Sequence, residues 1–532
     1  MPLAPSKKRY KKNNFIGNAK NIYLIGIKGV GMTALAQILK NRGKRISGSD
    51  TKEKFFTDKI LKKLGIPFKE GFEVSNLPKE TDLVIYSTAF NTKEHPEIIA
   101  AKRKKLPVIS YPTALGSLFN GELGIAISGT HGKTTTSALV AESMKNLGFG
   151  LTALIGSRVN NWGANALICK EEASAGTAPR QNKSHGLVSG WHPVSARKER
   201  KKPFFVIEAD EHQNKLKFYR PWSIILTNID YDHPDFYRKE SDYYNSFKDW
   251  VGKWKKAKFP LPKIGIFNGD DPKIKQLIKE LKLKSASNCL VLTYGKEKNC
   301  DFRIQNHLPS AHSPETGENK EKISNKINIR HAHKGTITIA TNLIGEHNAY
   351  NLTAAYAFIS ALLQITDRQS RITDNKIAKG FAAFAGTERR MQFKGKKGNV
   401  LVFDDYAHHP SEIKATLFSL KEAYPRHQLF VIFQPHTYTR TARFLNDFAK
   451  SLKIADLIGL LPIYGSAREI GGKVDSKDIQ KIIGKDRTEC LYFPNHKDCL
   501  KFLNNYPLKK PTILVTMGAG DGWRVGEGWL KS

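Results

Sequence analysis

The chain has 532 residues, of which 40% are hydrophobic and 25% charged, and its formal net charge is +37. This length exceeds what a single hydrophobic core serves, so we expect two to four domains, and the composition excludes a disordered or fibrous chain. The basic residues are scattered and no nucleic-acid-binding motif accompanies them. A lysine-rich surface is therefore favoured over a nucleic-acid partner.

The spacing of the cysteines and the length of the apolar runs indicate the cellular compartment in which we expect the protein. The five cysteines form no C-x-x-C pair, which excludes a disulfide framework and a zinc ribbon and favours a reducing cytoplasm. No apolar run is long enough to cross a bilayer, so we expect no membrane insertion. The basic tail, residues 1–20, leads into no apolar segment of the kind that a secretory signal needs.

The first predicted unit opens with a strand, a glycine-rich turn, a helix and a second strand. Gly26, Gly29 and Gly31 lie at and after the end of the strand NIYLIGI, and the segment RISGSD ends at Asp50. This order is typical of dinucleotide-type folds, although the glycine spacing is not G-x-G-x-x-G. Further strands, DLVIYST and LPVISY, complete a unit that we place at residues 21–117.

The second predicted unit begins with AISGTHGKTTTSALV. Gly129 and Gly132 allow the backbone to turn so that N–H groups point inward, and the following helix adds its positive N-terminal end. In such a loop Lys133 would reach the β- and γ-phosphates of a nucleotide, and the Thr134 hydroxyl would bind Mg²⁺. The generic phosphate loop has a glycine where Ile127 stands, so this loop is either a shortened variant or an accidental match.

Acidic residues follow the next two strands of this unit. Glu208, Asp210 and Glu211 end the run FFVIEADE, and His233 lies among acids in SIILTNIDYDHPDFY. Clustered carboxylates repel one another unless a cation is close, and Mg²⁺ is the economical counter-ion beside a phosphate loop. Solvated loop carboxylates are the alternative. We interpret His233 as a second metal ligand or a proton carrier.

The third predicted unit carries arginines and histidines near strand and helix ends. GEHNAYN offers His347 and Asn348 either as a stacking face and an amide for adenine or as an ordinary helix start. Arginine grips carboxylate or phosphate with a planar fork, so arginines at strand ends are natural clamps for an anionic substrate. The further candidates are Arg389, Arg390, Asp404, Asp405, His408, His409, His436 and Arg440.

We place the second unit at residues 118–343 and the third at residues 344–532. Two polar stretches, residues 171–202 and 304–334, are predicted to be structureless surface insertions. The second stretch contains four histidines, but no cysteine or acidic partner has matching spacing, so a metal site is not expected there. These histidines are His307, His312, His331 and His333.

The segments occur in one order along the chain, and their set resembles the Mur ligase family. They are GIKGVGM, GTHGKTTT, EADE, TNIDYDHPD, GEHNAYN, GTERRM, DDYAHHP, FQPHTYTRT and GAGD, between about residue 21 and residue 525. The resemblance implies an α/β fold of three domains: an N-terminal Rossmann-like domain for a UDP-sugar, a central phosphate-loop ATPase domain and a C-terminal Rossmann-like domain that closes over ATP.

The resemblance also implies an activity, namely ATP- and Mg²⁺-dependent amide formation through an acyl phosphate. Within the family the segments are most similar to the members that join L-alanine to the carboxylate of UDP-N-acetylmuramate. That reaction is the first peptide step of peptidoglycan precursor synthesis, and it would take place in the cytoplasm.

Roles of individual residues follow from the resemblance. The catalytic residues would be Lys133, Glu208, His233, His408 and Arg440. ATP would contact Gly129, Thr130, His131, Gly132, Lys133, Thr134, Thr135, His347, Asn348, Asn351, Arg389, Arg390 and Asp405. The UDP-sugar and the amino acid would contact Gly29, Gly31, Met32, Asp50, Ser87, Thr88, His436 and Arg440. The magnesium ion would be held by Thr134, Glu208 and His233.

Two departures from the family keep alternatives open. Thr437 replaces the first arginine of the family's H-R-Y-T-R segment, which removes one carboxylate clamp and leaves serine or glycine as alternatives to L-alanine. The segment EADEHQNKLKFYRPWSIIL is similar to a sister enzyme that attaches a recycled tripeptide to the same UDP-sugar, whereas FQPHTYTRT differs from it. A basic phosphate-loop NTPase that binds nucleic acid is the alternative of another class, but it explains none of the third unit's motifs. We expect a monomer or a homodimer.

Overall fold

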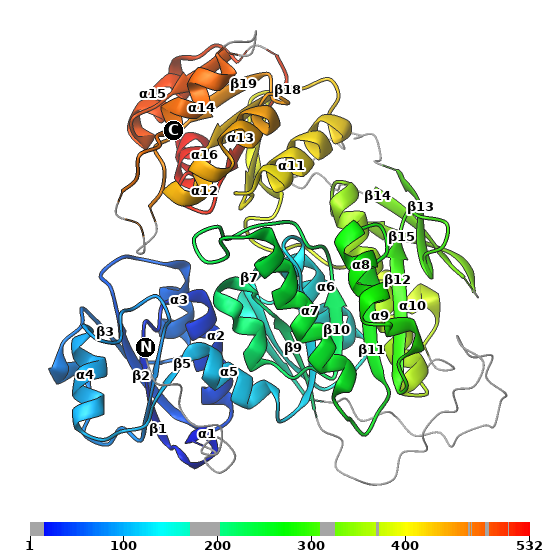
Figure 1. Ribbon diagram of the computed structural model, residues 1–532. Helices are drawn as coiled ribbons and strands as arrows, with labels where there is room; N and C mark the ends of the chain where they lie inside the picture. Colours follow the sequence, from blue (N-terminus) through cyan, green and yellow to red (C-terminus); the bar gives the residue numbers. More distant parts are fainter. Residues whose placement is uncertain are drawn as a thin grey trace.

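The computed structural model of the chain describes residues 15–170, 203–308, 325–332, 334–368, 372–465, 469, 471–484, 489–508 and 510–532. Strands in this part of the chain form three sheets, and helices cover them, which confirms the predicted α/β class. Figure 1 shows the blue first unit and the green second unit side by side, with the yellow-to-red third unit above them. The insertion predicted at residues 171–202 lies outside the described residues.

The first sheet has the strand order β3-β2-β1-β4-β5, and each of its pairs is parallel. Its strands are β1 (Asn21–Ile25), β2 (Arg45–Asp50), β3 (Phe68–Glu70), β4 (Leu83–Tyr86) and β5 (Val108–Ser110). Its helices are α1 (Phe15–Asn18), α2 (Val30–Asn41), α3 (Phe56–Lys63), the 3-10 helix η1 (Val74–Asn76), α4 (Pro96–Arg103) and α5 (Tyr111–Phe119). Order reversal beside β1 gives this sheet the crevice at which α/β folds bind ligands.

The second sheet has the order β15-β14-β13-β12-β11-β10-β6-β9-β7-β8. Its strands are β6 (Leu123–Ser128), β7 (Leu151–Val159), β8 (Ala164–Cys169), β9 (Phe204–Glu208), β10 (Ser223–Leu226), β11 (Lys263–Asn268), β12 (Cys289–Gly295), β13 (Phe302–Leu308), β14 (Asn325–His331) and β15 (Gly335–Thr341). Its helices are α6 (Lys133–Asn146), η2 (His212–Phe218), α7 (Glu240–Lys256), α8 (Pro272–Glu280), η3 (Leu283–Ser285), α9 (Glu346–Ile365) and α10 (Asp374–Ala382).

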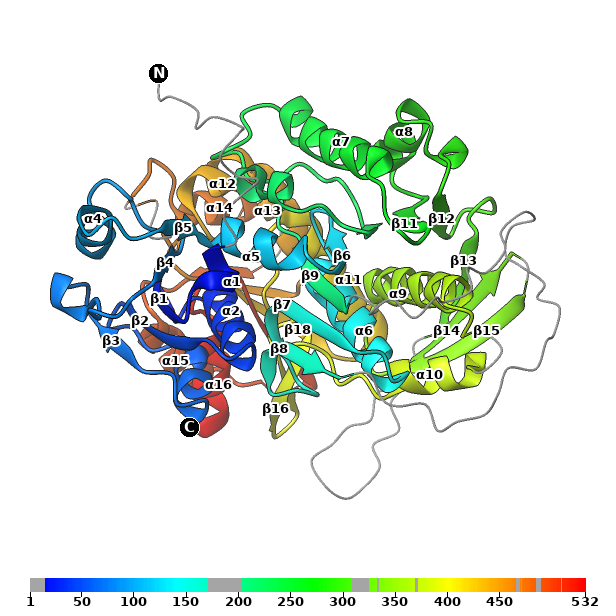
Figure 2. The ribbon, with the colours of Figure 1, turned by 90° about the horizontal axis from the view of Figure 1, so that it is seen from below.

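Three neighbouring strands of the second sheet, β10, β6 and β9, are parallel, so their carboxyl ends meet at one edge. The phosphate loop follows β6, and the two acidic segments of the sequence follow β9 and β10. The topology therefore brings together motifs that lie about a hundred residues apart. Helices α6 and α9 pack against each other beside this edge, as Figure 2 also shows.

The third sheet has the order β16-β17-β21-β18-β19-β20, parallel except for the pair β16–β17. Its strands are β16 (Gln392–Lys397), β17 (Val400–Asp405), β18 (Gln428–Phe433), β19 (Leu457–Leu460), β20 (Glu489–Tyr492) and β21 (Thr512–Met517). Its helices are α11 (Pro410–Ala423), α12 (Tyr438–Arg443), α13 (Leu445–Leu452), α14 (Ser476–Ile483), α15 (His496–Asn505) and α16 (Trp523–Lys531).

The prediction that residues 304–334 are structureless is wrong at both ends of the stretch. Strand β13 pairs antiparallel with β14, and β14 pairs antiparallel with β15, which extends the second sheet. Ile327 and Ile329 are fully buried on one face of β14. Alternation with period two was present in the sequence, but polar and basic neighbours masked it.

Among the described residues, no helix combines the length and the apolar character that crossing a membrane requires.

Candidate active site

The phosphate loop is the turn between β6 and α6, and its glycines are required by its shape. Gly129 and Gly132 have φ angles of +132° and +78°. A Cβ atom on Gly129 would lie 2.2 Å from Thr227 Oγ1, and one on Gly132 would lie 2.3 Å from Asn351 Oδ1. Both positions thus combine left-handed backbone with close approach, which only glycine accommodates. Helix α6 begins at Lys133, so its N-terminal end faces the turn.

Lys133 folds back over this loop. Its ammonium donates hydrogen bonds to the carbonyls of Gly129 and Thr130, the latter at 2.8 Å, and lies 3.0 Å from Glu211 Oε2. Burial raises the pKa of Glu211, but Lys133 and His233 outweigh it and hold that pKa below its usual value. Lys133 therefore has a carboxylate partner inside the site, which keeps the lysine charged and in place.

The acidic cluster provides donors that suit a divalent cation. Ligand atoms of Asp210, Glu211 and His233 lie within 4.8 Å of one another. Glu208 accepts a hydrogen bond from Thr134 Oγ1 at 3.0 Å. Carboxylate and hydroxyl oxygens are the ligands that Mg²⁺ prefers, so the residues fit the ion. The three predicted metal ligands thus lie in two groups. Thr134 contacts Glu208, and His233 Nε2 lies 3.4 Å from Glu211 Oε1.

The predicted adenine segment starts α9 and abuts the phosphate loop. Asn351 Oδ1 accepts a hydrogen bond from Thr136 Oγ1 at 3.2 Å, and Asn351 Nδ2 donates to Asn348 Oδ1 at 3.1 Å. Asn348 Nδ2 donates to the carbonyl of Ile344. Burial lowers the pKa of His347 to about 4, so its ring is neutral at pH 7 and suited to stacking.

The two adjacent arginines have different environments. Arg390 extends to the phosphate loop, where its guanidinium donates to Thr134 Oγ1 at 3.3 Å. Arg389 instead donates to Asp404 at 2.9 Å and to the carbonyls of Gly518 and Gly520. Arg390 is therefore placed to meet a phosphate, whereas Arg389 ties strand β17 to the loop after β21.

The remaining residues of the third unit are held by internal contacts. Asp405 accepts hydrogen bonds from Met391 N, Ala407 N and Thr416 Oγ1, and burial raises its pKa to about 6. His408 Nδ1 lies 3.0 Å from the carbonyl of Tyr406. Burial lowers the pKa of His408 to about 3, so the neutral ring donates from Nδ1 to this carbonyl.

Arg440 and His436 lie on the side of the third unit that faces the second. Arg440 donates to both carboxylate oxygens of Asp232, at 3.0 and 3.2 Å, and both side chains are 6% exposed. His436 Nδ1 lies 3.2 Å from Arg440 Nη1, and its ring stacks on Tyr464. The predicted amino-acid clamp is thus already paired with a carboxylate of the second unit.

The predicted UDP-sugar residues cluster at the carboxyl ends of β1, β2 and β4. Asp50 accepts hydrogen bonds from Lys28 N at 2.6 Å and Thr51 N at 2.7 Å. Gly29 caps α2, and a Cβ on Gly31 would lie 2.6 Å from Tyr111 Oη. The other members, Met32, Ser87 and Thr88, follow in α2 and after β4, and Met32 is 3% exposed and packs in the core.

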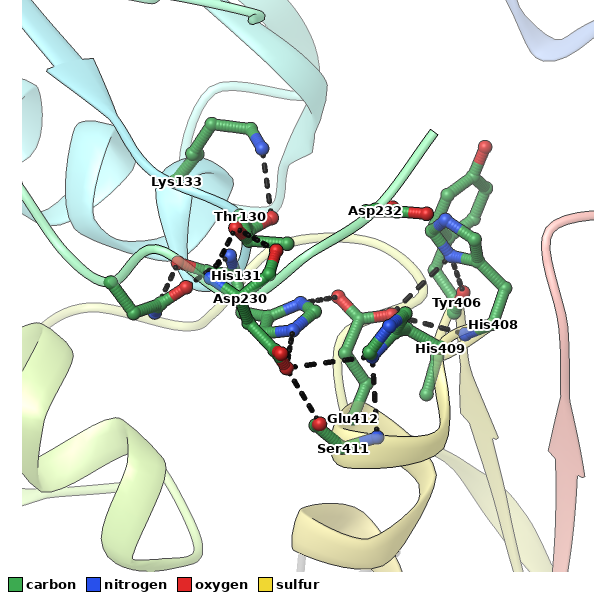
Figure 3. A network of polar contacts seen from close by, with 12 residues as sticks. Thr130, His131, Lys133, Asp230, Asp232, Tyr406, His408, His409, Ser411 and Glu412 are labelled. Carbon is green, nitrogen blue, oxygen red and sulfur yellow. Dashed lines mark hydrogen bonds and ion pairs between the residues drawn. The ribbon is translucent and has the colours of Figure 1, made fainter. Parts of the chain in front are cut away.

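Sequence reasoning missed two residues that join the second and third units, Asp230 and Glu412. His131 lies between them, with Nε2 3.1 Å from Asp230 Oδ2 and Nδ1 3.2 Å from Glu412 Oε1, as Figure 3 shows. The sequence signal for Asp230 was its position in the acidic segment TNIDYDHPD. Glu412 lies in the first turn of α11, where an acid is ordinarily interpreted as a complement to the helix dipole.

Three family models match the chain. They are described as "Mur ligase family, catalytic domain" at residues 21–122, "Mur ligase middle domain" at residues 127–359 and "Mur ligase, glutamate ligase domain" at residues 389–520. Among curated relatives, the UDP-N-acetylmuramate–L-alanine ligase of Treponema pallidum (strain Nichols) is 32% identical over 512 residues, 95% of each chain. That of Desulfatibacillum aliphaticivorans is 30% identical over 96% of this chain and 98% of its own.

Solved structures agree on the fold. The UDP-N-acetylmuramate-alanine ligase of Thermotoga maritima superposes with a TM-score of 0.71 at 22% identity, covering 96% of this chain and 98% of that one. A murein peptide ligase of Psychrobacter arcticus gives 0.64 at 21% identity, with the same coverage. The full-length sequence relatives and the three matching models lead to one assignment: the chain belongs to the Mur ligase family.

Proposed function

We propose that the chain is an ATP- and Mg²⁺-dependent ligase that joins L-alanine to the carboxylate of UDP-N-acetylmuramate, releasing ADP and phosphate in peptidoglycan precursor synthesis. The names of its full-length relatives support this substrate pair. The observation that carries the proposal is the contact of Arg390, from the third unit, with Thr134 of the phosphate loop. A nucleotide bound in the loop would thus contact residues of both the second and the third unit.

The charges of this site suit phosphoryl transfer to a carboxylate. Both reactants are anions, so their approach needs cations that are already in position. Lys133 and Arg390 supply two such cations at the phosphate loop. Thr134, Glu208 and His233 would hold the magnesium ion, which neutralises phosphate charge when bound.

The second half of the reaction would take place between the second and third units. The amine attacks the activated carbonyl carbon, and phosphate leaves with the electron pair of the broken C–O bond. Arg440, His408 and His436 lie on the third unit's side of this space. Contact between the two units excludes water from the activated carboxylate, which would otherwise be hydrolysed.

The proposal assigns UDP-sugar binding to residues 21–117 and ATP binding to residues 118–343 together with α9 and α10, which pack against the second sheet. It assigns closure and amino-acid binding to the remainder of residues 344–532. A cytoplasmic location follows from these substrates and agrees with the absence of C-x-x-C pairs. A monomer or a homodimer would suffice, since residues of one chain build the site.

A substrate panel tests the proposed function. The protein is incubated with UDP-N-acetylmuramate and Mg-ATP, together with L-alanine, L-serine, glycine or the tripeptide L-alanyl-γ-D-glutamyl-meso-diaminopimelate, and phosphate release and product mass are followed. We expect turnover with L-alanine at the highest kcat/KM. Turnover with the tripeptide alone would reverse the assignment in favour of the recycling ligase, and ATP hydrolysis that only DNA or RNA stimulates would discard both.

A further inference from the structure

The carboxylate of Glu412 makes several polar contacts at the boundary between the second and third units. Its Oε2 accepts a hydrogen bond from the main-chain N–H of His408 at 3.1 Å. Its Oε1 lies 3.2 Å from His131 Nδ1 and 3.8 Å from Arg390 Nη1. The side chain is 13% exposed. One buried carboxylate therefore contacts three residues expected to face ATP or the amino acid.

The phosphate-loop side of this contact is held by a second carboxylate. Asp230 Oδ2 lies 3.1 Å from His131 Nε2 and accepts a hydrogen bond from Ser411 Oγ at 2.7 Å. The main-chain N–H of His131 donates to Asn228 Oδ1 at 2.8 Å. Figure 3 shows His131 between the two carboxylates, with Glu412 on the helix of the third unit and Asp230 on the second unit.

This geometry links a cluster within the third unit to the phosphate loop of the second unit. Arg390, His408 and Glu412 all belong to the third unit, and His131 is the group of the phosphate loop that Glu412 meets when α11 lies against that loop. Charge-assisted hydrogen bonds of this kind are directional and are stronger than neutral ones. An arrangement that forms only on closure would withhold the complete catalytic site until both units have met.

We propose that Glu412 is a positioning residue of the ligation reaction, which orients Arg390 and His408 and ties them through His131 to the phosphate loop. The proposal rests on the proposed function for its reaction. It assigns Glu412 no direct contact with substrate. Its role is to hold the groups that make such contacts.

The first test is the isosteric change Glu412→Gln, which removes the charge and keeps the shape. The matched control is Glu422→Gln, in the same helix at an exposed position. We expect Glu412→Gln to lower kcat by about 30-fold, since charged hydrogen bonds that position two groups are lost. The KM for UDP-N-acetylmuramate should stay within about twofold of wild type, because that ligand is assigned to the first unit. Glu422→Gln should match wild type in both constants.

Two kinetic outcomes would overturn the proposal. One is a kcat for Glu412→Gln within about twofold of wild type. The other is a fall in kcat accompanied by a rise of the same factor in the KM for UDP-N-acetylmuramate and by a lower melting temperature. This combination would indicate a merely structural role.

A second readout needs no turnover and separates this proposal from the proposed function. Amide hydrogen exchange is measured on the peptide that contains residues 129–133, without ligands. Loss of the Glu412 contact should speed exchange there by about threefold or more in Glu412→Gln and leave it unchanged in Glu422→Gln. Unchanged exchange in both variants would refute the tie to the loop. If the wild-type enzyme failed to ligate, the function would be wrong, and this exchange experiment would still decide the role of Glu412.

Discussion

At the scale of single residues, the phosphate loop leaves no room for a side chain on Gly132. We predict that Gly132→Ala lowers kcat by at least about 100-fold, because the new methyl group would displace the loop from Asn351 and small misplacements at a reacting centre have effects of that size. Gly471 has open space around its Cβ position, so Gly471→Ala is the matched control. Steady-state kinetics of the two variants measure this difference in kcat. Equal kcat values for the two variants would mean that the loop is not the site of chemistry.

His131 gives the contact between the units a dependence on pH. Burial lowers its pKa, but Asp230 and Glu412 outweigh burial and raise it from 6.5 to about 9. The third titratable group facing the His131 ring is His409, and the two ring centroids lie 4.9 Å apart. Burial lowers the pKa of His409. A raised folded-state pKa stabilises the folded protein fully below pH 6.5, and this contribution is lost as the pH rises through about 9.

We therefore predict that the melting temperatures of wild type and His131→Gln differ most near pH 6 and converge above about pH 10. Differential scanning calorimetry of both proteins across this range measures the difference directly. A constant difference from pH 6 to pH 10 would show that His131 carries no charge in the folded protein.

At the scale of elements, the buried pair between Asp232, after β10, and Arg440, in α12, joins two units. Removing one partner leaves an unpaired buried charge, so Asp232→Ala should destabilise the protein by about 3 kcal/mol. The double variant Asp232→Ala with Arg440→Ala should cost less than the sum of the two single changes, since the double variant leaves no lone charge whereas each single variant leaves one. Thermal unfolding of the three variants tests this, and additive effects would exclude an energetic pair.

Elements with a strong local pattern could be predicted from the sequence. The strand, turn and helix around Gly129, and the strands ending at Asp50 and Glu208, follow from apolar runs and glycines. Strands β13 and β14 were missed because their alternating apolar residues are set among polar and basic residues. The contact between His131 and Glu412 was missed for another reason: these residues are 281 positions apart, and no local pattern records such a pairing.

At the scale of the whole molecule, the net charge of +37 would attract the proposed substrates through their negatively charged phosphates and carboxylates. A field of this sign raises the local concentration of nucleotides and is screened by salt. We predict that KM values for ATP and UDP-N-acetylmuramate rise when KCl is raised from about 50 to about 300 mM, while kcat changes little. Titration of KCl in the ligation assay measures both constants, and KM values independent of salt would mean that the charge has no part in substrate capture.

The central claim is that a nucleotide bound between Gly129 and Thr134 activates a carboxylate, with Lys133 as the cation that makes this feasible. The most direct measurement is the rate of UDP-N-acetylmuramoyl-L-alanine formation by Lys133→Ala at saturating Mg-ATP. The account predicts a loss of at least about 100-fold, the size found when a cationic or donor group at a reacting phosphate or oxyanion is removed. Product formation at the wild-type rate would contradict it.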